Sequence, residues 1–352
     1  MSQRIPVTVL GATGTVGQKF VSLLADHPWF EVAAVAASSA SAGRPYGEVV
    51  RWRESYPVPP PVGAMAIREC APPLPGSIVF SALDAEVAGP IEQEFARAGA
   101  YVVTNARTHR MDADVPLLIP EANADHLALI DRQRQARGWK GAILANPNCS
   151  TAALVMALAP LHQAFGVERV FVSTMQAVSG AGYPGVPSLD IVGNVIPYID
   201  GEEDKIERES RKILGSVGKG AVQPAQFAVS AHTSRVAVVD GHMITLSVGF
   251  NRRAGVDEAL AALREFRAPP CVAGLPSSPA APIEVDTRPD RPQPRLDLDR
   301  GRGMAVTVGR VRPCPILDLR MVVLGHNTVR GAAGQAIQIA ELLVAEGWVS
   351  RG

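Results

Sequence analysis

IPVTVLGATGTVG, at residues 5–17, contains the first strand-to-helix junction of the chain. Residues 5–10 are apolar and β-branched, as in a buried strand, and residues 15–25 carry apolar side chains at helical spacing. The loop between them has the spacing GxxGxxG, a variant of the dinucleotide-binding fingerprint. Such glycines permit a tight turn and let a pyrophosphate approach the helix N-terminus. The stretch predicts a dinucleotide-binding domain, with contacts from Gly11, Thr13, Gly14, Thr15, Val16 and Gly17.

The residues after the second predicted strand, at 31–37, bear on which dinucleotide binds. They include Ser38, Ser39 and Ser41, followed by Arg44, with no carboxylate among them. A carboxylate at this place would bind the ribose hydroxyls of NAD, whereas hydroxyls and an arginine suit the 2′-phosphate of NADP. We therefore expect NADP as the cofactor, with contacts from these three serines.

Two patterns of strands divide the chain. In the first part, strands predicted at 5–10, 31–37, 77–83, 101–104 and 142–145 alternate with helices, which implies a parallel, doubly wound sheet. After a helix at 151–165, alternating runs at 170–178, 243–250, 305–311 and 316–324 predict a mixed or antiparallel sheet. The proline-rich residues 268–297 are expected to be an irregular connection, and residues 331–346 a helix that packs on the first part.

The expected fold class is therefore α/β, with two domains. Residues 1–148 and 331–352 are expected to form a Rossmann-type, doubly wound NADP-binding domain. Residues 149–330 are expected to form an α+β catalytic and dimerisation domain with a mixed sheet. A chain of 352 residues is long enough for two such cores.

Composition excludes several other classes of protein. Hydrophobic residues make up 47% and charged residues 19%, which is not the composition of a disordered chain. Lys plus Arg equals Asp plus Glu at 34 each, which argues against nucleic-acid binding. The four cysteines are widely spaced without a CxxC pair, so neither a metal site nor disulfides are expected. No apolar run approaches the length of a membrane span, and a cytoplasmic location is the expectation.

A thiol occupies another strand-to-helix junction, in Asn146–Thr151 (NPNCST). A helix N-terminus favours a thiolate through its dipole and free N–H groups, so Cys149 is the predicted nucleophile; a buried structural thiol is the alternative. His242 is the candidate base and Arg235 a candidate anion ligand. In one unbroken strand these two residues, seven apart, would face opposite ways, unless the Asp240-Gly241 turn breaks the alternation.

Five segments resemble aspartate-β-semialdehyde dehydrogenase of the archaeal and fungal branch: residues 11–17, 146–151, 176–190 (QAVSGAGYPGVPSLD), 194–215 and 235–242. The resemblance covers nearly the whole chain in order. It implies NADPH-dependent reduction of L-aspartyl-4-phosphate to L-aspartate-4-semialdehyde with release of phosphate, in the pathway to lysine, threonine, methionine and isoleucine. It also implies a homodimer or homotetramer.

The same resemblance implies roles for individual residues. The nucleophile is Cys149 and the acid/base is His242, while Asn148 and Gln176 support the thiol and its acyl adduct. The substrate ligands are Arg235 for the α-carboxylate, Glu202 or its neighbour Glu203 for the α-ammonium, and Lys205 and Arg110 for the phosphate. Further cofactor contacts are Ser81, Ser179, Gly180 and Asn327. Asn327 opens a run of small residues that could instead serve close helix packing.

Three rival functions are weighed. Malonyl-CoA reductase is similar at residues 43–52 and 326–334, and N-acetyl-glutamyl-phosphate reductase is a more distant relative. Neither has a substrate with a free ammonium group for Glu202 to hold. A non-catalytic NADP-sensing protein would not need both Cys149 and His242.

Overall fold

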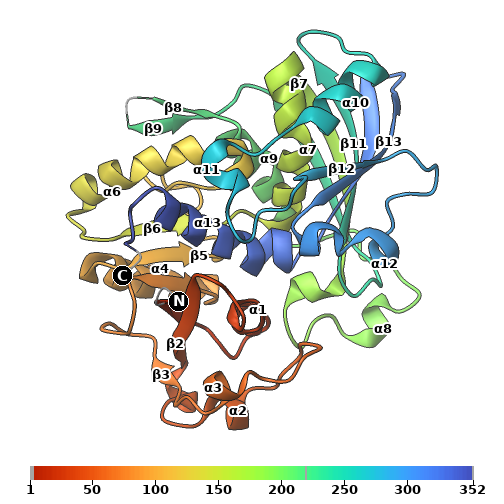
Figure 1. The fold of residues 1–352 in the computed structure, drawn as a ribbon. Coiled ribbons are helices and arrows are strands. Elements are labelled where there is room, and N and C mark those ends of the chain that lie inside the picture. Colours follow the sequence, from red (N-terminus) through yellow and green to blue (C-terminus); the bar gives the residue numbers. More distant parts are fainter. Residues whose placement is uncertain (1–3, 219, 351–352) are drawn as a thin grey trace.

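The computed structural model describes residues 4–218 and 220–350 and contains two six-stranded sheets, one above the other in Figure 1. The first sheet is wholly parallel, in the order β3-β2-β1-β4-β5-β6. Its strands are β1 (Ile5–Leu10), β2 (Phe30–Ala37), β3 (Arg68–Glu69), β4 (Ile78–Ser81), β5 (Tyr101–Thr104) and β6 (Ala142–Ala145). This is the doubly wound sheet expected from the alternation of strands and helices.

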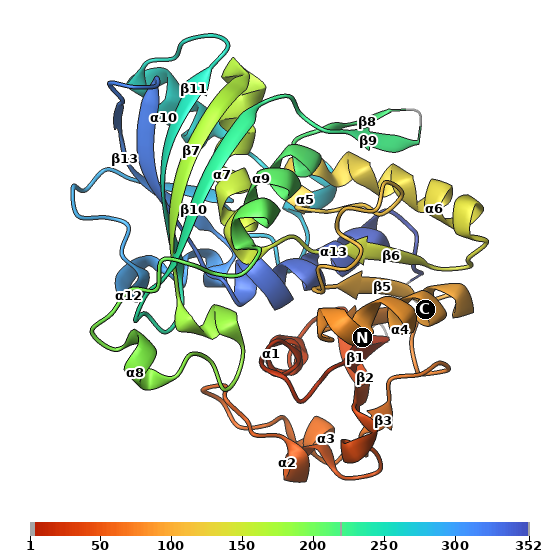
Figure 2. The ribbon, with the colours of Figure 1, turned by 180° about the vertical axis from the view of Figure 1, so that it is seen from behind.

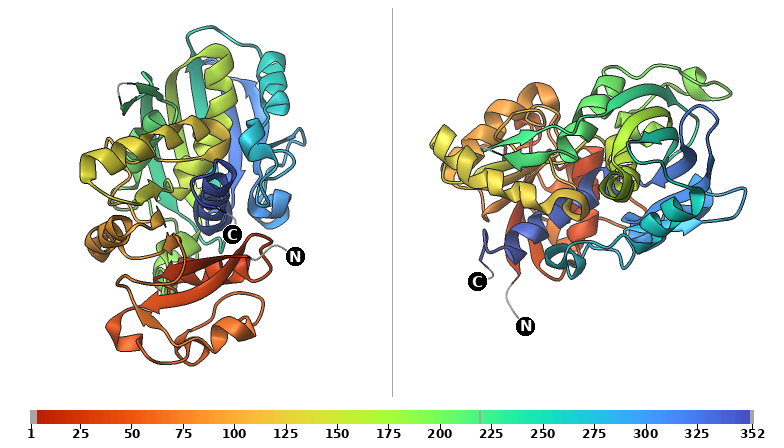
Figure 3. Two further views of the ribbon diagram at one scale, coloured as in Figure 1. Left: turned by 60° about the vertical axis from the view of Figure 1, so that its left-hand side comes forward. Right: turned by 90° about the horizontal axis from the view of Figure 1, so that it is seen from above.

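Helices cover both faces of this sheet because its strands are apolar on both sides. Val7 and Val9 pack in one core with α1 (Thr15–Leu24) and α13 (Gly334–Ala345). Leu10 and Val79 face the other core, with α4 (Ala85–Ala98). The other elements of this half are η1 (Ser39–Ser41), α2 (Tyr46–Val49), α3 (Pro60–Gly63), α5 (Pro120–Asn123), η2 (Ala124–Ala128) and α6 (Leu129–Arg137). Figure 3 shows α2, α3 and β3, in orange, at the edge away from the second sheet.

The second sheet is mixed, in the order β10-β7-β11-β14-β13-β12. Its two outer pairs, β10 with β7 and β12 with β13, are parallel, and the inner pairs are antiparallel. Its strands are β7 (Val167–Gln176), β10 (Ala228–Arg235), β11 (His242–Phe250), β12 (Ile283–Asp286), β13 (Val306–Pro313) and β14 (Leu319–Gly325). The predicted fold class, a doubly wound sheet with a second, mixed sheet, is confirmed.

One long helix fills the space under the second sheet. This is α7 (Cys149–Phe165), whose side chains from Ser150 to Leu161 are all buried. Its partners include β11, β14, α9 (Glu202–Ile213) and α10 (Val256–Glu265), and Figure 2 shows α9 beside it. The shorter elements are η3 (Val178–Ala181), α8 (Ser188–Ile191), β8 (Ser216–Gly218), β9 (Ala221–Gln223), α11 (Pro270–Ala273), α12 (Pro294–Asp297), η4 (Arg300–Gly303) and the π-helix η5 (Val329–Ala333).

Two expectations need correction. Residues 268–297 are not wholly irregular, because β12 pairs with β13 at the sheet edge and α11 and α12 flank it. A four-residue strand directly after Pro282 carries too little alternation to be recognised from sequence. The last helix begins at Gly334, after the π-helical turn of η5.

The first three and last two residues of the expected first domain lie outside the described residues.

Within residues 4–218 and 220–350, no helix is both long and apolar enough to cross a membrane.

Candidate active site

Cys149 is the first residue of α7, at the end of the short link from β6. Asn148 caps the helix: its Oδ1 accepts hydrogen bonds from the N–H groups of Ser150, at 3.0 Å, and Thr151, at 3.1 Å. The cap satisfies donors that a helix start leaves without partners. The strand-to-helix turn expected from sequence is therefore present, with the thiol at its helical end.

The charge state of the thiol differs from the expectation of a thiolate. Burial raises the pKa of Cys149 to about 12, and the negative charge of Glu202 adds to the effect. Arg110, the N–H of Ser150 and Arg235 act in the opposite direction and do not compensate. The stabilisation that the helix N-terminus gives a thiolate is smaller than the cost of removing a thiolate from water. The thiol of the free protein is therefore neutral.

Three neighbouring strands of the second sheet carry predicted site residues at the same end of the sheet. Gln176 ends β7, Arg235 ends β10 and His242 begins β11, and β7 lies between the other two strands. The odd spacing of Arg235 and His242 therefore does not force their side chains to opposite faces of the sheet, because the two residues lie on different strands. Ala177 joins them: its carbonyl accepts from Nη1 of Arg235 at 2.8 Å, and its N–H donates to Nδ1 of His242 at 3.1 Å.

The hydrogen bond from Ala177 sets the tautomer of His242. Since Nδ1 accepts, the neutral ring carries its proton on Nε2. Burial lowers the pKa of His242 to about 3, so the ring is neutral at ordinary pH. Nε2 has no hydrogen-bond partner among the described residues. A Cβ built on Gly180 would lie 3.1 Å from Nε2 and 3.0 Å from Nη1 of Arg235, so glycine leaves the room beside both groups.

Helix α9 supplies the buried acidic group of the site. Oε1 of Glu202 accepts from Nδ2 of Asn148 at 2.7 Å and from Nε2 of Gln176 at 3.1 Å, and Oε2 accepts from Lys205 at 2.9 Å. Burial opposes ionisation of Glu202, but Lys205 and these hydrogen bonds hold its pKa below the usual range. Glu203 points elsewhere, since it accepts from the N–H of Thr233 in β10 at 3.0 Å.

Arg110 lies in the loop after β5 and is buried. Its Nη1 donates to Oε1 of Glu209 at 2.9 Å and its Nη2 to the carbonyl of Asn105 at 2.8 Å. Its Nε is buried and has no partner among the described residues. The positive charges of Arg110 and Arg235 both act on the thiol of Cys149, so the structure brings these predicted residues together.

A cavity of about 610 Å³ opens at the carboxyl ends of β1 and β2. Gly11, Thr13, Gly14, Ser38 and Ser39 line it, as the sequence predicts for a cofactor. A Cβ on Gly11, whose φ is +68°, would lie 2.5 Å from the carbonyl oxygen of Ala82, and one on Gly17 would lie 2.2 Å from that of Gly11. The loop thus has the close backbone contacts for which the fingerprint needs glycine, and the chain fits a dinucleotide here.

Some predicted cofactor contacts do not line this cavity. Ser81 is fully buried and its hydroxyl donates to Glu92 at 2.6 Å, so Ala82 and Leu83 form the wall instead. Glu69, at the end of β3, does line it and was not predicted. It was missed because the pairing of β2 with a two-residue strand cannot be read from sequence. The other predicted contacts outside the lining are Thr15, Val16, Gly17, Ser41, Ser179, Gly180 and Asn327.

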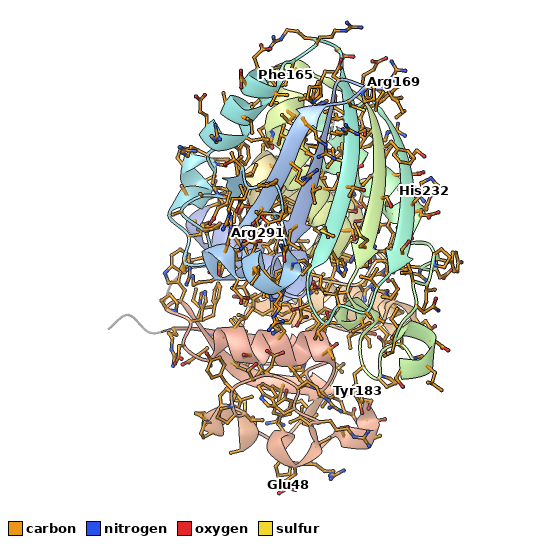
Figure 4. All side chains as sticks on the ribbon, turned by 90° about the vertical axis from the view of Figure 1, so that its right-hand side faces the viewer. Glu48, Phe165, Arg169, Tyr183, His232 and Arg291 are labelled. Atoms are coloured by element: carbon orange, nitrogen blue, oxygen red, sulfur yellow. The ribbon has the colours of Figure 1, made fainter. Side chains whose placement is uncertain are left out.

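Ser179 and Gly180, two of these residues, lie in the segment that follows β7, between the two halves. Ser179 accepts from Nδ2 of Asn327 at 2.7 Å, and Oδ1 of Asn327 accepts from the N–H of Gly241 at 2.7 Å. A Cβ on Gly182 would lie 4.0 Å from the hydroxyl of Thr15, and Arg53 lies over the ring of Tyr183 at 4.1 Å. Figure 4 shows Tyr183 where the second sheet meets the first half. This loop connects the surroundings of His242 to the glycine loop.

The run of small residues before α13 packs on Cys149, the predicted nucleophile. A Cβ built on Gly331 would lie 2.5 Å from Cβ and 2.8 Å from Cα of Cys149. Next to it, Arg330 is fully buried and donates to both oxygens of Glu121, at 2.9 and 2.7 Å. This ion pair holds η5 in place, so Gly331 forms a wall behind Cys149.

The geometry agrees with comparisons to known proteins. Residues 6–130 match the semialdehyde dehydrogenase NAD binding domain, and residues 158–330 match the semialdehyde dehydrogenase dimerisation domain. Aspartate-semialdehyde dehydrogenase of Archaeoglobus fulgidus is 49% identical over 97% of this chain and 99% of its own length. This chain belongs to the aspartate-semialdehyde dehydrogenase family.

Fungal relatives and solved structures support the same placement. The enzyme of Cryptococcus neoformans is 48% identical over 98% of each chain. The crystal structure of the Candida albicans enzyme with NADP superposes with a TM-score of 0.91, at 43% identity, covering 98% of this chain and 100% of that one. Enzyme II of Vibrio cholerae, complexed with ASA, gives 0.77 at 26% identity with the same coverage. The predicted family and branch are confirmed.

Substitution of Gly331 by alanine is expected to displace Cys149 and to reduce the catalytic rate by about a hundredfold, because misplacing a reacting group by ~1 Å costs about that much. Gly274 is the matched control, since a Cβ there meets nothing within 4 Å. Dinucleotide binding by fluorescence titration should survive in both variants. Wild-type rates in Gly331→Ala would show that the wall is not needed.

The ionisation of Cys149 predicts an unusual pH profile. A solvated thiol titrates near about 8.5, so its alkylation rate levels off above that pH. With its pKa raised to about 12, Cys149 should instead react tenfold faster per pH unit up to about pH 10. The measurement is carbamidomethylation of Cys149 followed by mass spectrometry of its peptide. A plateau at or below about pH 9, as for a solvated thiol, would contradict the raised pKa of Cys149.

Proposed function

We propose that this chain reduces L-aspartyl-4-phosphate to L-aspartate-4-semialdehyde with NADPH, releasing phosphate. The observation that carries the proposal is the pair of opposite charges at Cys149. Glu202 and Arg235 both act on the thiol, which suits a substrate with an ammonium and a carboxylate on the same carbon. Membership of the aspartate-semialdehyde dehydrogenase family supports the same reaction.

In this proposal the substrate is held by charged groups at both ends. Arg235 binds the α-carboxylate through its planar fork, and Glu202 binds the α-ammonium. Glu203 is the weaker candidate because its carboxylate binds the N–H of Thr233. Lys205 and Arg110 bind the phosphate. When the ammonium pairs with Glu202, part of the charge that raises the pKa of the thiol is offset, so substrate binding favours the thiolate.

The reaction proceeds through acyl transfer to sulfur. Sγ of Cys149 attacks the acyl carbon, and the N–H of Cys149 stabilises the oxyanion. The carbon–oxygen bond to phosphate then breaks to leave a thioester, and the departing phosphate carries away the proton that the thiol loses. Bound NADPH supplies the hydride that reduces this thioester. The N–H at Nε2 of His242 donates a hydrogen bond to the oxygen of the resulting tetrahedral adduct. Cleavage of the carbon–sulfur bond then releases the aldehyde and the thiolate of Cys149, which takes a proton from water.

The tautomer of His242 favours the donor side of its expected acid/base role. The N–H at Nε2 can donate a hydrogen bond to an oxygen that gains negative charge. Accepting the thiol proton at Nδ1 would displace the hydrogen bond from Ala177. We therefore assign to His242 chiefly the stabilisation of the negatively charged substrate oxygen.

NADP is the proposed cofactor. The lining by Ser38 and Ser39 suits a 2′-phosphate, and the Candida albicans relative was solved with NADP. Glu69 on the same wall is a carboxylate of the kind that binds the ribose of NAD, so NAD is the necessary comparison.

The proposed reaction is tested in reverse. L-aspartate-4-semialdehyde, phosphate and NADP should produce reduced cofactor, detected by its absorbance, and NAD should be used less well. Cys149→Ser should lose at least a thousandfold, because the hydroxyl is a poor nucleophile. Full activity of that variant would refute the thioester. Faster reduction of malonyl-CoA than turnover of the semialdehyde would favour malonyl-CoA reductase, and no turnover at all would leave an NADP-binding sensor.

We also propose that two copies associate through the open face of the second sheet. The family match names residues 158–330 a dimerisation domain. This face exposes 49% of Phe171, and Ile316, 87% exposed, borders an apolar hollow of about 420 Å³ on it. Figure 4 views this face. We propose further that residues 1–148 and 331–352 form one domain and residues 149–330 the other. The start of α7 at Cys149 and the packing of α13 on the first sheet support this division.

Phe171→Asp is expected to convert a dimer to a monomer, because a charge in an apolar interface costs several kcal/mol (about 2–5) unless paired. Light scattering after size-exclusion chromatography measures the mass. Tyr56→Asp, at a side chain 77% exposed in the first half, is the control and should remain dimeric. An unchanged mass for Phe171→Asp would place the interface elsewhere.

A further inference from the structure

Glu209 is a buried carboxylate of α9 to which the mechanism above gives no task. Its exposed fraction is 2%. Oε1 accepts from Nη1 of Arg110 at 2.9 Å, and Oε2 accepts from the N–H of Asn148 at 2.6 Å. One carboxylate therefore connects the phosphate-binding arginine to the main chain of the turn that carries Cys149.

Lys212, on the same face of α9, strengthens this connection. Its Nζ donates to the carbonyls of Arg110, at 2.7 Å, of Asp112, at 2.7 Å, and of Val115, at 2.8 Å. Three backbone acceptors satisfy the buried ammonium, which otherwise would be costly in this place. The loop that carries Arg110 is thus held to α9 by its main chain as well as by its guanidinium.

The turn before Cys149 is also held to α9 by both a side-chain and a main-chain contact. Glu202, two helical turns before Glu209, binds the side chain of Asn148, and Glu209 binds the main chain of Asn148. Arg110 and Asn148 follow neighbouring strands, β5 and β6, at positions 38 apart in the chain. The two loops bond directly where Nδ2 of Asn146 donates to Oδ1 of Asn105 at 2.8 Å. Contacts through α9 add a second connection, made at Arg110 and Asn148 themselves.

An acyl phosphate makes the relative position of the two loops important. Its phosphorus and its acyl carbon are joined through one oxygen, so the cation and the nucleophile must be correctly placed at the same time. We propose that Glu209 is a positioning residue that fixes the guanidinium of Arg110 relative to Cys149 for the departure and return of phosphate. This inference rests on the proposed function.

The inference predicts a selective defect in Glu209→Gln. The amide keeps one acceptor but turns an NH₂ group toward one of the two donors, so one connection is lost. Two measurements need only one of the loops and should change less than about threefold. One is the rate of the burst of reduced cofactor from semialdehyde and NADP without phosphate. The other is the affinity for phosphate, measured by calorimetry. Attack of phosphate on the acyl-enzyme needs both loops and should slow by about 10- to 100-fold.

Asp204→Asn is the matched control, because Asp204 lies on the exposed face of α9 and pairs with Arg208 at 3.3 Å. All three measurements should stay at wild-type values in that variant. If Glu209→Gln does not fold, Glu209→Asp keeps the charge beside Arg110 but is too short to reach both donors, and the same selective defect is expected.

The outcomes separate the two proposals. Absence of turnover in the wild type would refute the proposed function. An active wild type with phosphate attack within threefold in Glu209→Gln or Glu209→Asp would refute the positioning role alone. Equal loss in all three measurements would show that Glu209 serves folding only and would equally overturn the inference.

Discussion

The burial of α7 on all sides is the constraint on which the site depends. From Ser150 to Leu161 this helix packs under the second sheet, and its apolar residues share one core with side chains of the first sheet. Its first residue is therefore fixed by core packing on both halves of the molecule. Cys149 cannot move without moving that core, and Gly331 closes the space behind it.

The same burial explains the charges around the thiol. A buried helix start needs partners for its polar groups, and the partners are Asn148, Glu202 and Glu209, two of them carboxylates. Each carboxylate is in turn paired with a cation, Lys205 or Arg110. Arg235 adds a third cation that bonds only a carbonyl among the described residues, and the thiol and the imidazole of the free site are both neutral. A substrate with charges at both ends changes the charges around the thiol when it binds.

Much of the fold was predictable where short-range patterns carry the information. The strand and helix on either side of the glycine loop were placed within one residue of their observed bounds, because alternation and helical spacing are local properties. β12 was missed because it is stable only as a neighbour of β13. Glu209 and Lys212 were missed, although their spacing of seven and ten residues from Glu202 places all three on one helix face.

The sequence by itself determined the alternating architecture, the glycine loop, the thiol at a helix start and the resemblance to the family. These follow from residue types at short spacings along the chain. Only the tertiary structure decided that the thiol is neutral, that His242 carries its proton on Nε2 and that Ser81 faces the core while Glu69 faces the cavity. Each of these depends on burial or on contact between residues far apart in the chain, and neither quantity is contained in a local pattern.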